Sequence, residues 1–388
     1  MPNTTFPEQR QYAFFGVENP YANPANPTGP DVLYFEEGDF TWSREILMRP
    51  RGAASPGRSG FRPCATEQHC VWSLSNQEVA MIDIVTADDA DAPPQDKLFR
   101  CCGFERVSDV ATRTHTYILR PYGHESISIR AFDVDRTDSD NQEVTIIGAR
   151  ADFTLNWENG DFFRISNDGM GLVLDEDPFI DMRSTLAGST VEAPVYYDLK
   201  PFVCKGGTIK ILNLDDGDAP YGGGDKATLL NEVLLKRFDV SGNMNPVMQH
   251  GGSSTAAVGR IALRPTDMVE ATLVVEQTAY TEWHPWNQMF QGQRLECNFL
   301  LEQPGAPNNT LQILFYGQVM TVSRGIEEGE RSWEMSVMLL HPADAAGGVI
   351  GAGDDPNQQF NTGTDQGLIA TPAGGLVPGI LALQFRTT

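Results

Sequence analysis

Apolar and polar residues alternate with a period of two along most of this 388-residue chain. Such alternation places apolar side chains on one face of a β-strand and polar side chains on the other. In the first half, the pattern covers residues 114–121, 126–134, 143–150, 151–160 and 161–174. In the second half, it covers residues 206–214, 259–265, 269–279, 294–303, 309–324 and 331–340. The chain is therefore restricted to a mainly β fold made of many short strands.

Turn-forming residues separate these segments, and the chain contains 37 Gly and 25 Pro. The run ENGD at 158–161 predicts a hairpin turn between two strands. Helical periodicity is confined to residues 94–102, 226–238 and 284–292. We therefore expect a few short helices on a β framework.

Two short motifs nearly repeat, EILMRP at 45–50 and RIALRP beginning at 260. Each is followed by a second apolar block that reads as a strand, at 78–87 in the first half and at 269–279 in the second.

A third block also recurs in the same order, at 153–174 and at 297–322. Both copies read as a strand, a turn and a strand with a central glycine, Gly169 or Gly317. Three recurring blocks in one order predict two tandem domains of one fold.

The resulting division begins with an N-terminal arm at 1–30, rich in Asn, Pro and Tyr. A first domain follows at 31–195, with an insertion loop at 51–77 that the second domain, 196–342, lacks. Residues 343–388 form a Gly-rich segment that ends in an apolar docking strand. That strand can fold back on its own core or add to a neighbour's sheet edge. Because the segment carries little core, we expect its removal to impair contacts with a neighbouring copy of the chain more than folding.

The chain is acidic, with 52 Asp and Glu against 28 Lys and Arg and a formal charge of −24. This charge disfavours binding to nucleic acid and to anionic membranes. The N-terminal residues lack the basic start and apolar core of a signal peptide, and we find no membrane-spanning run. We expect synthesis in the cytosol and no membrane partner.

The six cysteines favour reduced thiols in a large chain without a secretion signal. A zinc site at Cys64, His69 and Cys70 is a weaker alternative, because the spacing is non-standard and a second ligand pair is missing.

Two acidic segments suggest cation sites, although solvated loops fit both better. One contains Asp133, Asp135, Asp138 and Asp140 at intervals like those of a calcium loop. It lacks the glycine and the final glutamate that such a loop requires. The other is the Gly- and Asp-rich segment 214–225.

No constellation of catalytic residues stands out, and the six histidines are too scattered to propose a triad. The segment around His284, with Trp283 and Trp286, is compatible with a protein interface or with core packing. We therefore predict a structural protein rather than an enzyme, with no catalytic residue, cofactor or metal.

The segment DKLFRCCGFERVS, beginning at 96, and the strands that follow it resemble tail tube proteins of long-tailed, siphovirus-type bacteriophages. The resemblance extends over roughly 30–340 and includes an early arginine strand and a later Arg-Pro strand. Its motif positions are Arg49, Gly103, Tyr117, Gly148, Gly169 and Arg264. One departure is Ala151, where the group commonly has glycine.

This resemblance implies two tandem tail-tube-type β-sandwich domains that contribute to a β-barrel lumen in an assembled ring. Three chains would supply six similar domains, so we expect homotrimeric, pseudo-hexameric rings in preference to hexamers. The implied partners are further copies of the chain, the tape measure protein, the tail terminator and tail-tip proteins. Double-stranded DNA would pass through without specific binding, and the location would be the virion after assembly in the bacterial cytoplasm.

The acidity fits two explanations equally, repulsion of DNA from the lumen and simple solubility. The insertion 51–77 and both termini are the segments expected to form ring-to-ring contacts. Alternative functions are a capsid decoration protein, a baseplate or tail-tip protein, and a carbohydrate-binding β protein that uses Tyr280, Trp283 and Trp286.

Overall fold

The computed structural model is mainly β, as predicted, and its described strands pair antiparallel. It describes residues 11–19, 21–22, 32–35, 38–51, 61–119, 124–133, 142–173, 199–203, 208–213, 228–249, 260–264, 268–278, 283–292, 294–327, 329–340 and 380–387.

The first half contains β1 (Gln11–Val17), β2 (Val32–Phe35), β3 (Phe40–Arg51), β4 (Phe61–Glu78), α1 (Asp96–Cys101), β5 (Phe104–Asp109), β6 (Thr114–Leu119), β7 (Ile127–Asp133), β8 (Gln142–Glu158) and β9 (Arg164–Val173). The second half contains β10 (Thr208–Asn213), β11 (Thr228–Ser241), β12 (Pro246–Gln249), β13 (Arg260–Leu263), β14 (Glu270–Glu276), α2 (Pro285–Gln291), β15 (Arg294–Gln303), β16 (Ala306–Glu327), β17 (Glu330–Leu339) and β18 (Leu381–Thr387).

Sixteen of these strands belong to one hydrogen-bonded network, whose main path is β2-β1-β7-β8-β11-β10-β15-β16-β18-β6-β5. Strands β9, β4 and β3 branch from β8, and strands β14 and β17 connect β11 with β16. Strands β12 and β13 form a separate pair. Six of these strands, β11, β10, β15, β16, β17 and β14, pair in a cycle, with β11 and β16 each shared between two sheets. Among the described strands, the network as a whole remains open at β2, β5 and β3.

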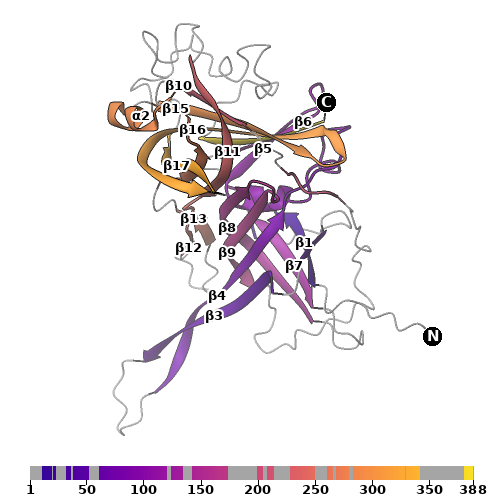
Figure 1. Ribbon diagram of the computed structural model, residues 1–388. Coiled ribbons are helices and arrows are strands. Elements are labelled where there is room, and N and C mark those ends of the chain that lie inside the picture. Colours follow the sequence, from indigo (N-terminus) through magenta and orange to yellow (C-terminus); the bar gives the residue numbers. More distant parts are fainter. Residues whose placement is uncertain are drawn as a thin grey trace, which may run out of the picture.

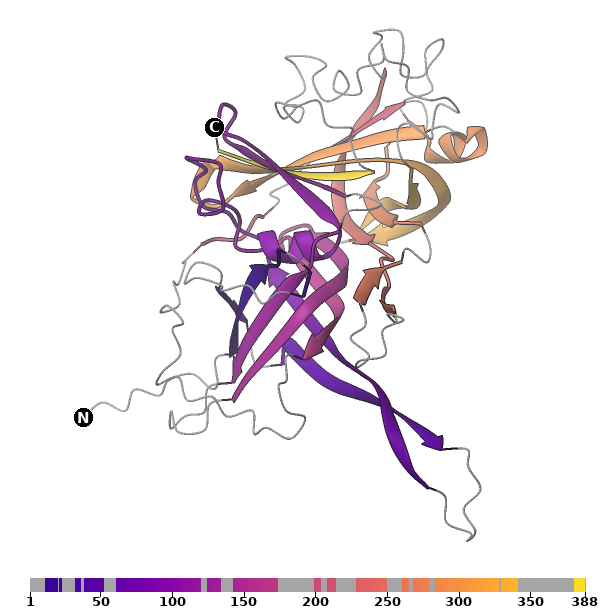
Figure 2. The same cartoon turned by 180° about the vertical axis from the view of Figure 1, so that it is seen from behind.

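The molecule has an upper part with β10, β15, β16, β17 and α2, and a lower part with β1, β7, β8 and β9 (Figure 1). The β3–β4 hairpin projects from the lower part, and the view from behind shows the same arrangement (Figure 2).

Strands β11 and β16 each change partners along their length, and a bulge marks the change. The register of β11 shifts at Leu235/Arg237, where its partner changes from β10 to β14. The register of β16 against β17 shifts at Val319/Thr321, just after its pairing with β15 ends. Bulges bend a strand, which lets one strand serve two sheets.

The bulge in β11 explains why the helix predicted over 226–238 is wrong. Val233, Leu235, Phe238 and Val240 are buried, so the apolar face follows a strand period that slips by one residue at Lys236. That slip produces spacings of three in the sequence, which resemble helical periodicity. The other two predicted helices are confirmed as α1 and α2.

The strands predicted separately at 143–150 and 151–160 are one strand, β8. The hairpin turn at 158–161 is confirmed, and the Asp161 N–H donates to the Glu158 carbonyl at 3.0 Å.

The strand predicted at 78–87 is wrong after its first residue. The Ile84 N–H donates to Thr387 Oγ1 at 2.9 Å, and the Val79 N–H donates to the Phe163 carbonyl at 2.9 Å. A side chain and an isolated backbone carbonyl thus accept the N–H groups of this segment, and its described residues form no β-ladder. Val79 and Ile84 are nevertheless buried in the core.

The near-repeat EILMRP and RIALRP occupies different places in the two halves. The first copy lies in the long hairpin formed by β3 and β4. The second lies in β13, which among the described strands pairs only with β12. The predicted insertion loop 51–77 consists largely of β4. Within the predicted N-terminal segment 1–30, Gln11–Val17 form β1, which pairs with β2 and β7.

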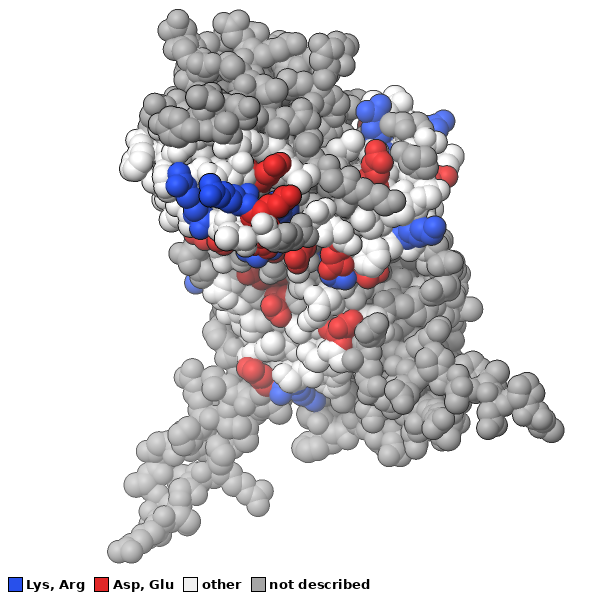
Figure 3. Space-filling view, in the orientation of Figure 1, with Lys and Arg blue, Asp and Glu red and all other residues white. Residues whose placement is uncertain are grey.

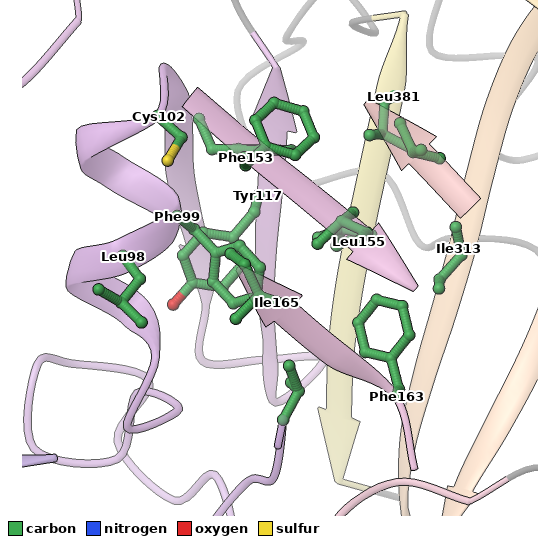
Figure 4. Packing of buried hydrophobic residues seen from close by; sticks show 14 of the residues in the cluster. Leu98, Phe99, Cys102, Tyr117, Phe153, Leu155, Phe163, Ile165, Ile313 and Leu381 are labelled. Carbon is green, nitrogen blue, oxygen red and sulfur yellow. The ribbon is translucent and has the colours of Figure 1, made fainter. Parts of the chain in front are cut away.

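One continuous cluster of buried apolar side chains extends through both parts of the molecule. In Figure 4, side chains from α1, β6, β8 and β9 meet those of β16 and β18. Phe385 of β18 lies 6.0 Å from Phe99, 5.5 Å from Tyr117 and 5.8 Å from Phe202, measured between ring centroids. The apolar strand near the C-terminus therefore folds back onto its own core, between β6 and β16.

Candidate assembly surface

The outer half of the β3–β4 hairpin, called the arm here, comprises residues 46–51 and 61–68. Strand β4 pairs with β9 from Cys70 to Glu78. Toward the tip, from residue 69 back to 61, its partner among the described strands is β3 alone. The described arm is thus a two-stranded ribbon outside the body (Figure 1). A lone two-stranded hairpin is at best marginally stable in water, so the arm is suited to packing against a partner.

The base of the arm is fixed to the body by a buried tryptophan. The Trp72 side chain is 1% exposed and lies over Gly169 of the paired strand β9. A Cβ at Gly169 would approach the Trp72 ring to 2.3 Å. Gly169 therefore provides the space for Trp72. On the other side of β9, Gly169 pairs with the small residue Ala151 of β8.

Tyr117 joins the α1 segment through a buried carboxylate that sequence reasoning did not single out. Its hydroxyl donates to Asp96 Oδ1 at 2.7 Å, and Asp96 is fully buried. Arg106 Nη1 donates to the same oxygen at 3.0 Å. Lys97 and Arg100 lie 3.1 and 3.4 Å from Asp96 Oδ2.

These contacts set the ionisation of the pair. Burial opposes ionisation of Asp96, but Lys97, Arg106 and Arg100 outweigh it and lower its pKa. Burial and the Asp96 charge raise the pKa of Tyr117 well above its usual value. Tyr117 thus stays a hydrogen-bond donor to an ionised Asp96.

The two other glycines among the predicted motif positions, Gly103 and Gly148, have positive φ. Gly103 has φ 95° and lies just after the C-terminal end of α1. Its N–H donates to the Arg100 carbonyl at 3.2 Å. Gly148 has φ 60° within a bulge of β8. Its N–H donates to Glu18 Oε1 at 2.7 Å. Glycine suits both positions because L side chains rarely adopt this backbone region.

The structure does not gather the predicted motif positions into one site. Gly103 directly follows α1, and Tyr117 is bonded to α1 through Asp96. Gly169 lies at the base of the arm, and Arg49 is a residue of the arm itself. Arg264 is exposed, and its N–H donates to the Met244 carbonyl at 3.2 Å. Gly103, Tyr117, Gly148 and Gly169 each support the local packing or hydrogen bonding of their own segment.

The aromatic group around His284 is packed rather than open. Trp283 is buried in the core, and Trp286 lies 5.3 Å from Trp333 between ring centroids. The Arg324 guanidinium lies over Trp286 and Trp333, at 4.8 and 4.9 Å from their ring centroids. This stacking covers ring faces that a sugar would use. Tyr280 lies outside the described residues.

Among the described residues, no group of three or more His, Cys, Asp or Glu side chains could hold a metal ion. His69 pairs with Glu45 at 3.1 Å, whereas Cys70 is a buried free thiol on the adjoining position of β4. Of the acidic segments, 134–141 and 214–225 lie outside the described residues.

One constellation escaped the sequence reasoning, which found the histidines too scattered for a triad. Ser108 and His115 face each other across β5 and β6, and Asp91 reaches His115 from the preceding loop. The offset of seven residues across a hairpin was readable in principle. The approach of Asp91 was not, because it depends on an irregular loop.

Several β edges are open among the described strands. Strand β5 pairs only with β6, β2 only with β1, and β3 only with β4. On the face seen in Figure 3, described acidic side chains lie scattered among basic ones and form no continuous patch.

No protein-family model matches this chain, and a search of curated proteins finds no significant match. Neither described helix has the length and apolar character needed to cross a membrane.

Proposed function

We propose that this chain is a structural virion protein that polymerises into stacked rings and forms the hollow tail tube of a siphovirus-type bacteriophage. The observation that carries the proposal is the arm, a two-stranded ribbon that leaves the body and pairs only with itself among the described strands. Its outer residues gain stability by packing on another copy. This assignment rests also on the resemblance of the α1 segment and its following strands to tail tube proteins.

Open edges at β5, β2 and β3 support ring closure between chains. An edge strand presents unpaired N–H and C=O groups that a neighbouring strand can satisfy. Head-to-tail pairing of unlike edges generates a closed ring when the rotation between subunits permits it. In this proposal the lumen is created by assembly and is not a property of one chain.

Two related units within the chain would allow a trimer to form a pseudo-hexameric ring. The hairpins β8–β9 and β15–β16 support this relation, since each carries a glycine beneath a bulky neighbour. Gly169 lies against Trp72, and Gly317 lies against Val337. The domain boundaries at 31–195 and 196–342 belong to this proposal.

The net charge of −24 suits a duct through which double-stranded DNA must slide without binding. The further partners proposed are the tape measure protein, the tail terminator and tail-tip proteins. Assembly would occur in the bacterial cytoplasm, and the final location would be the virion tail.

Negative-stain electron microscopy of the purified full chain tests this function, with top views averaged for rotational symmetry. Hollow rings or tubes with three chains per ring are expected. Six chains per ring would retain the function and overturn the paired units. Monomers under every condition tested would contradict the tube and favour a decoration or baseplate protein.

The arm can be tested separately because its described strands pair with each other and with no strand of the body. Residues 46–68 are replaced by Asn-Gly, which connects the paired residues Glu45 and His69 through a two-residue turn. We expect a folded monomer with an unchanged melting temperature and no tubes. Tubes of normal length from this variant would remove the arm from the proposal.

A further inference from the structure

Asp91, His115 and Ser108 form a continuous hydrogen-bonded chain that ends at the protein surface. Ser108 Oγ lies 2.7 Å from His115 Nδ1, and His115 Nε2 lies 3.1 Å from Asp91 Oδ1. His115 is fully buried and Asp91 is 6% exposed, whereas Ser108 is an exposed residue of β5.

The partners of Asp91 determine which nitrogen of His115 carries the proton. Asp91 Oδ2 accepts the N–H groups of Val85, Thr86 and Ala87 at 2.7, 2.6 and 2.9 Å. Burial opposes its ionisation, but the N–H donors of Thr86 and Val85 and the bond with His115 lower the pKa of Asp91 to about 2. An ionised carboxylate only accepts hydrogen bonds, so His115 Nε2 must be the donor.

The other ring nitrogen is therefore a base directed at Ser108. Burial lowers the pKa of His115, with Arg106 acting in the same direction and Asp91 and Asp96 in the opposite one. The ring is thus neutral at neutral pH, and Nδ1 accepts the Ser108 hydroxyl. This is the relation between nucleophile, base and orienting carboxylate used in acyl transfer, with the two ring nitrogens exchanged.

The location of Ser108 also supplies access. In a single chain, strand β5 pairs only with β6 among the described strands, so its outer edge is open before any pairing with another copy. Such an edge leaves backbone N–H groups without a strand partner, and the exposed Ser108 hydroxyl is open to a small ester.

We propose that Ser108 is a base-assisted nucleophile that accepts acyl groups from carboxylic esters. Ser108 Oγ attacks the carbonyl carbon while its proton passes to His115 Nδ1. The bond from that carbon to the leaving oxygen then breaks, and the leaving alkoxide takes the proton from His115 and departs as an alcohol. The product is an acyl ester of Ser108, which water can hydrolyse by the same route.

The test is acetylation of the full chain with 4-nitrophenyl acetate, followed by mass spectrometry of the serine-containing peptides. Ser241 is the internal control, because it is exposed and its Oγ contacts Asn243 Oδ1 at 3.3 Å rather than a histidine. General-base assistance typically contributes about 100-fold or more. We expect Ser108 to be acetylated at least about 100-fold faster than Ser241. Equal rates would overturn the proposal.

The variant His115→Gln should reduce acetylation of Ser108 to the rate of Ser241, and Ser241→Ala should change nothing at Ser108. An unchanged Ser108 rate in the folded His115→Gln variant would also overturn the proposal. If that variant does not fold, the pH profile of the wild-type chain decides. The Ser108 rate must rise with one deprotonation below pH 6.5, the ordinary value for histidine, and then level off. A rate that follows hydroxide concentration throughout would exclude His115 as the base.

Discussion

Asp96 is the residue on which the α1 region depends, because one buried carboxylate accepts from Tyr117 and faces three cations. The variant Asp96→Asn keeps the size of the side chain but removes the buried charge shared by Arg106, Arg100 and Lys97, leaving Arg106 with Asp89 and Arg100 with Glu125. Removing one member of a buried ion pair typically costs about 3 kcal/mol or more. We expect a loss of about 3 kcal/mol in urea unfolding.

Tyr117→Phe should lose less, about 2 kcal/mol, since only a hydrogen bond to a charged group is removed. Asp168→Asn is the matched control, because Asp168 is exposed on β9. A control loss as large as that of Asp96→Asn would refute the role assigned to this network.

Gly169 is a second residue with a defined steric role. Gly169→Ala places a Cβ against the rigid Trp72 ring, and overpacking of this kind costs about 2 kcal/mol. Gly325→Ala is the control, because its new Cβ would meet only the Ser332 hydroxyl, at 3.1 Å. Thermal unfolding should separate the two variants clearly. Similar melting temperatures would mean that Trp72 can move aside.

The lowered pKa of His115 predicts a pH dependence of stability. Below about pH 6.5 the unfolded chain takes up a proton at His115 that the folded chain resists. The contribution of His115 is therefore complete above pH 6.5 and is lost as the pH falls through that value. Urea unfolding at pH 7.5 and 5.5 should show a smaller decrease for His115→Gln than for wild type. An equal decrease would assign the effect to other groups.

At the residue scale, the sequence identified several residues that have structural roles, but it did not identify the residues that they contact. The resemblance singled out Tyr117, Gly148 and Gly169, and all three have steric or hydrogen-bonding roles. It did not give Asp96 or Glu18, because a buried acid in an acidic chain carries no local signal. Only tertiary contact distinguishes it from its exposed neighbours.

At the element scale, periodicity identified most strands but failed where the backbone departs from a regular ladder. Strand β11 was mistaken for a helix because Lys236 adds one residue at a bulge. Segment 79–87 was mistaken for a strand because its apolar residues are buried without ladder pairing. Both errors arise from long-range pairing, which a sequence window does not contain.

Strand β18 contradicts the premise that segment 343–388 carries little core, since Leu381, Leu383 and Phe385 belong to the buried cluster. It pairs with β6 and β16, and six of its seven residues are buried. Deletion of 381–388 should expose two sheet edges and a large apolar surface. We expect insoluble protein, measured as the soluble fraction after expression. A soluble deletion variant with a native circular dichroism spectrum would show that β18 is dispensable.

At the scale of the whole molecule, the two predicted domains share a core and sheet contacts. Strand β8 pairs with β11, and β18 joins β16 to β6. We therefore expect one calorimetric unfolding transition, with equal calorimetric and van't Hoff enthalpies. Two separate transitions would show that the units are thermodynamically independent.

The position of β18 also orders events during synthesis. Strands β6 and β16 leave the ribosome before their common partner, so a growing chain carries both edges open until residue 387 has emerged. Nascent edges of this kind can pair wrongly with those of neighbouring chains on the same messenger RNA. A chain terminated before residue 381 would thus retain both open edges and misfold. Completion of β18 is therefore a condition that every folded copy of this chain must meet.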